Sequence, residues 1–164
     1  MTKRIDVAHV PAVAGTTYPD PLAGPCLARE KRKLGDVAGL TQFGVNLLRL
    51  PPGSWSSQRH WHTASDEFIY VLSGEVTLVT DAGEERLRAG DAAGFKAGEP
   101  NGHCLRNLSQ SEVLVLEVGS RVPGDVGHYP ELDLVAHADG RPALYTRRDG
   151  TPYADVGRRG PTDN

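Results

Sequence analysis

Short strand patterns separated by turn residues fill the middle of the chain. Each pattern is five to eight residues long, and glycine, proline, aspartate or asparagine marks most of the breaks, as at Asp81-Ala82-Gly83. The patterns cover residues 43–50, 58–63, 67–72, 75–80, 84–88, 92–96, 103–107 and 112–118. Strands this short, at this turn spacing, favour a sandwich or a barrel. The sequence therefore predicts an all-β domain.

Two irregular segments flank this domain. We expect residues 1–39 to form an N-terminal arm, because the prolines of Tyr18-Pro19-Asp20-Pro21 are incompatible with a helix interior. Residues 40–120 are predicted to form the barrel. Residues 121–164 are predicted to form a C-terminal extension that packs on the barrel, with a disordered tail after about Gly157.

Charge and hydropathy argue against several classes of partner. The formal net charge is -3 and the sequence pI is about 6.0, which gives no electrostatic reason to expect nucleic acid. No apolar run approaches the ~18 residues that a membrane span needs, and the N-terminus lacks the apolar region of a signal peptide. Cys26 and Cys104 are the only cysteines, and we expect two free thiols. These features predict a soluble cytoplasmic protein.

The residues suited to chemistry concentrate between Gly53 and Gly74. His60 and His62 are two positions apart on a predicted strand, so both imidazoles would point to the same face. A turn at Ser65 reverses the chain, and Glu67 at the start of the next strand can return a carboxylate to that face. Two nitrogens and one oxygen that converge in this way suit a divalent metal ion with open coordination positions.

A fourth ligand is expected from elsewhere in the barrel. Of the six histidines, His9 lies in the arm, and His128 and His137 lie in turn-rich parts of the C-terminal extension. Only His103 opens a predicted strand inside the β-domain. His103 is therefore the candidate for this position.

Two motifs in the central third of the chain, residues 53–107, resemble those of the cupin superfamily. The first cupin motif runs glycine, HxH, three or four residues, Glu, six residues and Gly. This chain has His60-Trp61-His62, four residues, Glu67, six residues and Gly74. The second motif runs Gly-Asp, Pro-x-Gly, His, three residues and Asn. This chain has Gly90-Asp91, Lys96-Ala97-Gly98, His103, three residues and Asn107.

The chain departs from these motifs in three places. Gly53 lies one residue farther from His60 than is usual, and Lys96 replaces the customary proline. Two extra residues separate Gly98 from His103, so the loop before that histidine is expected to be longer.

The resemblance implies a double-stranded β-helix, or jelly-roll barrel, with a metal ion inside one end. It also implies that the metal ligands are His60, His62, Glu67 and His103. Three imidazoles and one carboxylate suit Zn, Fe, Mn, Ni or Co as divalent ions. Asp66 is the competing carboxylate, but strand alternation places it on the face opposite Glu67. The resemblance to small cupins further implies a homodimer. The two subunits could form it by exchanging their N-terminal arms.

The activity expected from this resemblance is metal Lewis-acid chemistry of the isomerase type on a small polar substrate, either sugar-like or a hydroxy or keto acid. Single-domain cupins of this kind include proteins provisionally assigned as sugar-phosphate isomerases. Two alternatives stay open, an Fe(II) dioxygenase and a non-catalytic protein that binds a small molecule. Gln58 shares strand parity with His60 and is a candidate substrate contact. Glu117 is a candidate general base, although the pattern of its strand does not fix which way it faces.

Overall fold

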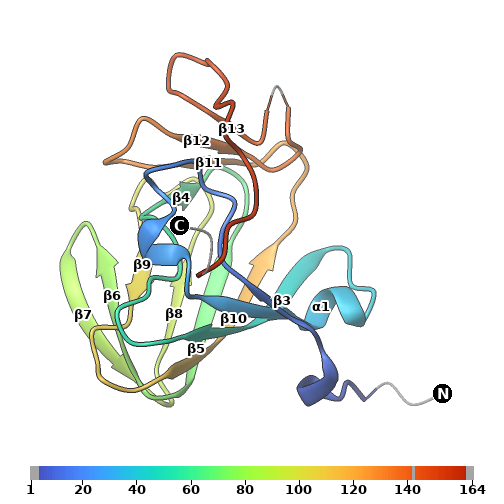
Figure 1. Cartoon of the computed structure of the whole chain (residues 1–164), viewed down its shortest axis with the longest axis vertical. Helices are drawn as coiled ribbons and strands as arrows, with labels where there is room; N and C mark the ends of the chain where they lie inside the picture. The colour runs from blue at the N-terminus through green and yellow to red at the C-terminus, as the bar shows by residue number, and fades with distance from the viewer. Residues whose placement is uncertain (1–3, 142, 162–164) are drawn as a thin grey trace.

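The regular secondary structure of the described residues is almost entirely antiparallel β-strand (Figure 1). The computed structural model describes residues 4–141 and 143–161. Its strands are β1 (Ala12–Ala14), β2 (Glu30–Lys33), β3 (Phe43–Leu50), β4 (Trp61–His62), β5 (Glu67–Ser73), β6 (Glu75–Thr80), β7 (Gly83–Arg88), β8 (Ala92–Phe95), β9 (Cys104–Arg106), β10 (Val113–Ser120), β11 (Val126–His128), β12 (Val135–His137) and β13 (Tyr145–Thr146). The helical turns are η1 (Val7–His9), η2 (Gly24–Cys26) and α1 (Leu34–Val37). The all-β prediction is confirmed, and within the described ranges no helix has the length and apolar character needed to cross a membrane.

The largest sheet has six strands in the order β1-β2-β3-β10-β5-β8. Its centre is the pairing of β3 with β10, which runs from Phe43 opposite Ser120 to Leu50 opposite Val113. Strand β10 also pairs with β5, so segments far apart in sequence lie side by side. Strands β1 and β2 come from the segment expected to be an arm, and they extend this sheet beyond β3.

A second sheet, in the order β7-β6-β9, faces the first across the hydrophobic core. One cluster of buried side chains includes Leu48 of β3, Val71 of β5 and Val115 of β10 from the large sheet. Val76 of β6 and Leu105 of β9 belong to the same cluster but come from the smaller sheet. The two sheets therefore enclose one apolar core, as the barrel prediction requires.

The two faces of the large sheet differ because side chains alternate along each strand. On β5, Ile69 and Val71 are buried in the core, whereas Phe68, Tyr70 and Leu72 are exposed on the outer face. An exposed apolar strip of this kind is typical of an association surface. The homodimer stays a prediction, and this outer face is where we expect its partner subunit to bind.

The third sheet, β13-β12-β11-β4, lies over one end of the barrel, at the top of Figure 1. Its strand β4 carries His62, and its other three strands belong to the C-terminal extension. A second buried cluster joins this extension to the N-terminal segment and includes Tyr18, Tyr129 and Tyr145. Both extensions are therefore packed against the end of the barrel where the histidines lie.

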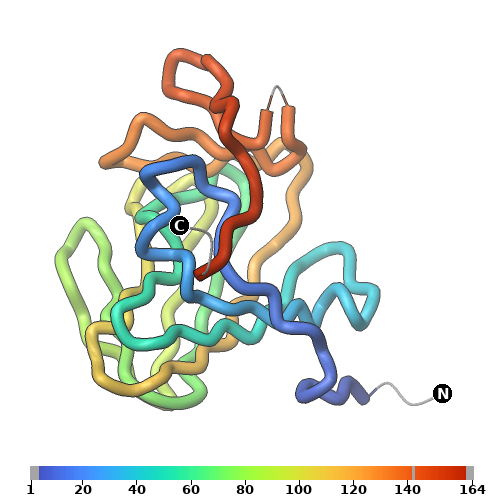
Figure 2. The backbone as a smooth tube through the Cα atoms, in the orientation of Figure 1, coloured from blue at the N-terminus to red at the C-terminus, as the bar shows by residue number. Residues whose placement is uncertain are grey.

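The last described residues run beside the N-terminal segment around Thr16 (Figure 2). Thr16 and Arg159 exchange two backbone hydrogen bonds, with N–O distances of 2.9 and 2.8 Å. The Arg159 side chain also donates to the Tyr18 carbonyl. The part of the predicted tail between residues 157 and 161 is therefore tied to the N-terminal segment, and residues 162–164 lie outside the described range.

Asn107, the last residue of the second motif, has a structural role. Its side chain is fully buried. The amide donates to the Leu50 carbonyl at 2.8 Å and to the Ser111 carbonyl at 2.7 Å, and its oxygen accepts from Ser109. These bonds hold the turn between β9 and β10 against the end of β3.

Candidate metal centre

Three of the predicted ligands converge at the mouth of the barrel. The ligand atoms of His60, His62 and Glu67 all lie within 4.8 Å of one another. The Nε2 atoms of His60 and His62 are 3.7 and 3.6 Å from Glu67 Oε2, and the Nε2 atom of His103 is 2.9 Å from the same oxygen. Ligands bound at about 2.1 Å to one ion lie about 3.0 to 3.4 Å apart in octahedral or tetrahedral arrangement. The distances to Glu67 are close to this range, so these side chains lie near enough to one another to hold a divalent ion.

Backbone pairing brings the histidines from separate segments together. His60 and His103 form an isolated antiparallel bridge, with N–O distances of 3.1 and 2.8 Å. His62 follows in β4, where it pairs with Gly127 of β11. Trp61 points the other way and stacks on His128 at a centroid distance of 4.7 Å. The alternation inferred for the HxH motif is therefore present.

His60 is held in the tautomer that leaves Nε2 free. Its Nδ1–H donates to the Gln58 carbonyl at 2.9 Å, so the lone pair is on Nε2, which faces Glu67. The ring also stacks on Tyr129, with centroids 5.6 Å apart. Burial lowers the pKa of His60 to about 4, so the imidazole is neutral near pH 7. A neutral imidazole is the form that binds metals.

His62 is oriented by a buried carboxylate that the sequence reading missed. Its Nδ1 lies 2.6 Å from Oδ2 of Asp125, which is 4% exposed. The other carboxylate oxygen accepts from the backbone amides of Ala64 and Ser65, at 2.8 and 3.2 Å. Burial opposes ionisation of Asp125, but the Ala64 amide and His62 outweigh it and hold the pKa of Asp125 below its usual value. A metal-bound histidine typically donates its other ring N–H to a carboxylate, a backbone carbonyl or water, and this bond fixes the orientation of the ring.

Glu67 and His103 are in direct contact. The His103 ring lies flat against Phe95, with centroids 3.5 Å apart, and its Nδ1 has no hydrogen-bond partner among the described residues. Packing therefore sets the position of this ring. Burial opposes ionisation of Glu67, yet the hydrogen bond from His103 and the imidazoles of His60 and His62 outweigh it, so the pKa of Glu67 is held below its usual value. Glu67 is an anion at neutral pH.

We expect Asp125→Asn to weaken metal binding by about 10- to 100-fold. An asparagine keeps one oxygen for His62 but places an amide against the Ala64 and Ser65 N–H groups, which then lose their acceptor. Competition with a chelator for zinc measures the change. Asp133→Asn is the matched control, because Asp133 pairs with Arg147 on the surface. Equal zinc affinities of the two variants would contradict the role given to Asp125.

The structure places the side chains of Asp66 and Gln58 away from the cluster. Asp66 is exposed, and its Oδ1 accepts from the Ala97 amide at 2.8 Å. This agrees with the choice of Glu67 as the inward carboxylate. The Gln58 side chain donates to the Leu22 carbonyl at 2.7 Å, so it fastens the N-terminal segment. Gln58 supports the cluster through its backbone oxygen, which accepts from His60.

A cavity of about 380 Å³ opens beside the cluster. His60, Glu67 and His103 contribute to one side of it. The charged residues that line the rest are Arg29, Lys31, Lys33, Asp36, Glu117 and Arg121. Basic side chains outnumber acidic ones by four to three when Glu67 is included, so the cavity favours an anionic ligand.

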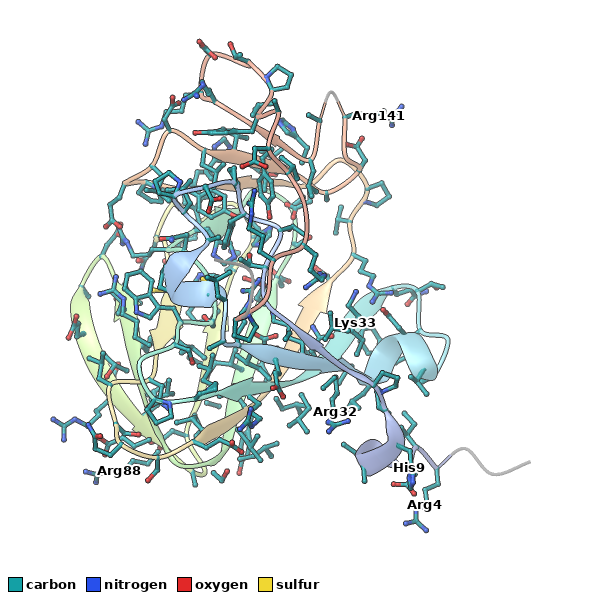
Figure 3. The ribbon with its side chains drawn as sticks, in the orientation of Figure 1. Arg4, His9, Arg32, Lys33, Arg88 and Arg141 are labelled. Atoms are coloured by element: carbon teal, nitrogen blue, oxygen red, sulfur yellow. The ribbon has the colours of Figure 1, made fainter. Side chains whose placement is uncertain are left out.

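The basic residues that line the cavity differ in the hydrogen bonds and ion pairs that they already make with other protein groups. Arg29 donates to the carbonyls of Gly15 and Ser56, so it mainly joins the N-terminal segment to the barrel. Lys33 lies 3.9 Å from Asp36, which also pairs with Arg121. Figure 3 shows Lys33 and its neighbour Arg32 on opposite sides of β2, as strand alternation requires. The Lys33 and Arg121 side chains are 53% and 43% exposed, against 28% for Lys31, so they are the cations best placed to meet a ligand at the outer end of the cavity.

Comparison with known proteins identifies relatives of this chain. A family model described as "Cupin domain" matches residues 46–119. A crystal structure of a sugar phosphate isomerase from a cupin superfamily, from Silicibacter pomeroyi, is 39% identical with a TM-score of 0.86, and the match covers 94% of this chain and 99% of that one. A protein from Acidithiobacillus ferrooxidans, provisionally assigned as a sugar phosphate isomerase, is 31% identical with a TM-score of 0.64, over 68% of this chain and 70% of that one.

A more distant structure has a different activity. The polyketide cyclase RemF from Streptomyces resistomycificus is 26% identical with a TM-score of 0.58, and the match covers 73% of this chain and 80% of that one. No curated protein sequence matches this chain significantly. The likeness to RemF also shows that this barrel serves more than one chemistry, so the activity has to be argued from the site.

Proposed function

The chain belongs to the cupin superfamily and has its double-stranded β-helix fold, and from this premise we propose that it is a metal-dependent isomerase of a small phosphorylated sugar. The four ligands in this proposal are His60, His62, Glu67 and His103. The observation that carries the proposal is the cavity, which runs from this cluster to a wall of charged side chains. The naming of the Silicibacter pomeroyi relative supports the same substrate class.

The residues around the cluster fit a divalent ion in two respects. His60 and His62 present free Nε2 lone pairs, because their Nδ1 atoms bond to Gln58 and Asp125. The carboxylate of Glu67 supplies a negative charge. A bound ion would act as a Lewis acid on the carbonyl and hydroxyl oxygens of a substrate. The protein side chains would orient that substrate and exclude water from it.

The size and polarity of the cavity favour a sugar phosphate over an apolar substrate. A volume of about 380 Å³ is near the lower end of the range of about 300 to 1,000 Å³ seen for small-molecule sites. A dioxygenase of apolar compounds is expected to have mostly apolar walls. Here Lys33 and Arg121 stand at the outer end, where they would meet a phosphate, while the sugar carbons would reach Glu67.

Two measurements on the wild-type protein test this proposal. Metal analysis of protein purified without added metal should find about one divalent ion per chain. Nuclear magnetic resonance should then detect interconversion of ketose and aldose phosphates in a panel that includes fructose 6-phosphate and ribulose 5-phosphate. Bound iron with substrate-dependent oxygen uptake would overturn the proposal in favour of a dioxygenase. Binding of these compounds without any interconversion would favour a non-catalytic binding protein.

A further inference from the structure

An ion pair inside the cavity is separate from the metal cluster. Lys31 Nζ lies 2.7 Å from Glu117 Oε2, and the two side chains are 28% and 18% exposed. Both residues line the cavity that His60 and Glu67 also line. The pair is therefore accessible to whatever occupies that cavity.

The register of the large sheet explains why both side chains point inward. Lys31 of β2 lies opposite Leu48 of β3, whose side chain is fully buried in the core. Glu117 of β10 lies opposite Asn46 of β3 and opposite Ile69 of β5. The ion pair thus reaches diagonally across β3 on the inner face, next to the Asn46 amide that also lines the cavity.

The same register fixes the distance between Glu117 and the metal cluster. Glu67 pairs with Gly119, two residues beyond Glu117 on the same face of β10. The Cα atoms of diagonal neighbours of this kind lie about 7 to 8 Å apart in an antiparallel pair. Gly119 has no side chain to fill the space between them, and it lines the cavity. A substrate carbon can therefore lie between the two carboxylates.

A purely structural salt bridge is the alternative explanation. Ion pairs removed from water are seldom net stabilising, because the cost of desolvation offsets the attraction. Strand β3 itself shows the contrast, since its surface pair Arg49–Glu112 lies on the outer side with both side chains more than 40% exposed. A role in the reaction is therefore a better explanation for an ion pair that lies in the cavity beside the cluster.

We propose that Glu117 is the catalytic base of the isomerisation and that Lys31 holds its carboxylate toward the substrate. This inference rests on the proposed function and adds the group that moves the proton. The Glu117 carboxylate removes the proton from the hydroxyl-bearing carbon next to the substrate carbonyl. The C–H electron pair becomes the double bond of an enediolate, and the carbonyl π pair moves onto its oxygen.

The reaction is completed without any other reactant. The proton of the neighbouring hydroxyl transfers to the former carbonyl oxygen, and the electron pair left behind forms the new carbonyl. The enediolate double bond takes the proton back from Glu117 at the former carbonyl carbon. The aldose and ketose phosphates therefore interconvert with no oxidant or reductant, and Glu117 ends as a carboxylate.

The test is Glu117→Gln, assayed in deuterium oxide with fructose 6-phosphate and ribulose 5-phosphate. We expect interconversion and deuterium incorporation next to the carbonyl to fall by at least about 100-fold. Metal content and binding of the same compounds by calorimetry should remain unchanged. The matched control is Glu112→Gln, which removes the surface ion pair with Arg49 and should leave the rates as in wild type.

A double variant covers the case in which Glu117→Gln fails to fold around an unpaired lysine. Lys31→Met combined with Glu117→Gln removes both charges, and it should show the same loss of activity and exchange. A folded Glu117→Gln or double variant that retains the wild-type rate would overturn the role of Glu117. Wild-type turnover without deuterium incorporation, together with full activity of Glu117→Gln, would indicate a hydride shift and overturn it as well. Wild-type protein that converts no sugar phosphate would overturn the proposed function itself.

Discussion

Replacing His62 by alanine is expected to lower the metal content of the purified protein from about one ion per chain to below about a tenth. The variant loses one nitrogen ligand and also leaves the Asp125 carboxylate without its partner at 2.6 Å. Loss of an outer partner alone typically costs 10- to 100-fold in affinity, so loss of a ligand together with its support should cost more. Mass spectrometric metal analysis after exhaustive dialysis measures the result.

His128→Ala is the matched control for this experiment. His128 is a histidine of the same end of the barrel, but it stacks on the outward side chain of Trp61. Its removal should leave the metal content as in wild type. If His62→Ala keeps a full complement of metal, the assignment of the cluster as a metal site is refuted.

Gly119→Val is expected to reduce turnover of sugar phosphates by about 100-fold while the metal stays bound. Gly119 lies opposite Glu67 on β5 and opposite Gly44 on β3, and both glycines line the cavity. A Cβ atom at position 119 would lie 3.6 Å from Glu67 Cγ. The two further methyl groups of valine would then occupy the space that the substrate needs, and small misplacements of a substrate can cost this much in rate.

Gly119→Ala separates blockage of the cavity from general damage. The single methyl group makes only ordinary van der Waals contacts at this position, so alanine should retain most of the activity. Valine is a favourable strand residue, so the fold should persist in both variants, and circular dichroism with metal analysis checks this. Equal rates for the valine and wild-type proteins would show that the substrate does not pass Gly119.

The barrel and the inward residues of the cluster were accessible from sequence because they depend on local alternation. His60 and His62 share a face, and Glu67 rather than Asp66 points inward, as period-two spacing requires. His103 was the candidate fourth ligand because it opens a predicted strand in the β-domain, and the motif resemblance implied the same residue. The structure places it against Glu67. These features can be predicted from the residue pattern within short segments of the chain.

Contacts between distant segments were not accessible in this way. Asp125 bonds to His62 across 63 residues, and no spacing rule links a residue in the C-terminal extension to the HxH motif. Tyr129 stacks on His60 for the same kind of reason. Gln58 illustrates a different limit, because it lies before β4 in irregular backbone, where strand parity does not determine direction.

The residue pattern of β10 alone did not show whether the Glu117 side chain points into the barrel or away from it. Leucine and valine occupy both faces of β10, so the pattern has no clear inside. Only the pairing with Asn46 and Ile69 places the carboxylate in the cavity. This register depends on how β3, β10 and β5 pair with one another, so the direction of Glu117 could be determined only from the folded structure.

Anomalous diffraction at the absorption edge of the bound metal tests the central claim most directly. Crystals of protein purified without chelator should show one anomalous peak, about 2.0 to 2.3 Å from the Nε2 atoms of His60, His62 and His103 and from a carboxylate oxygen of Glu67. In that state the His103–Glu67 hydrogen bond should be replaced by two bonds to the metal. A map without a peak at this cluster, or a peak that leaves His103 hydrogen-bonded to Glu67, would contradict the four-ligand site.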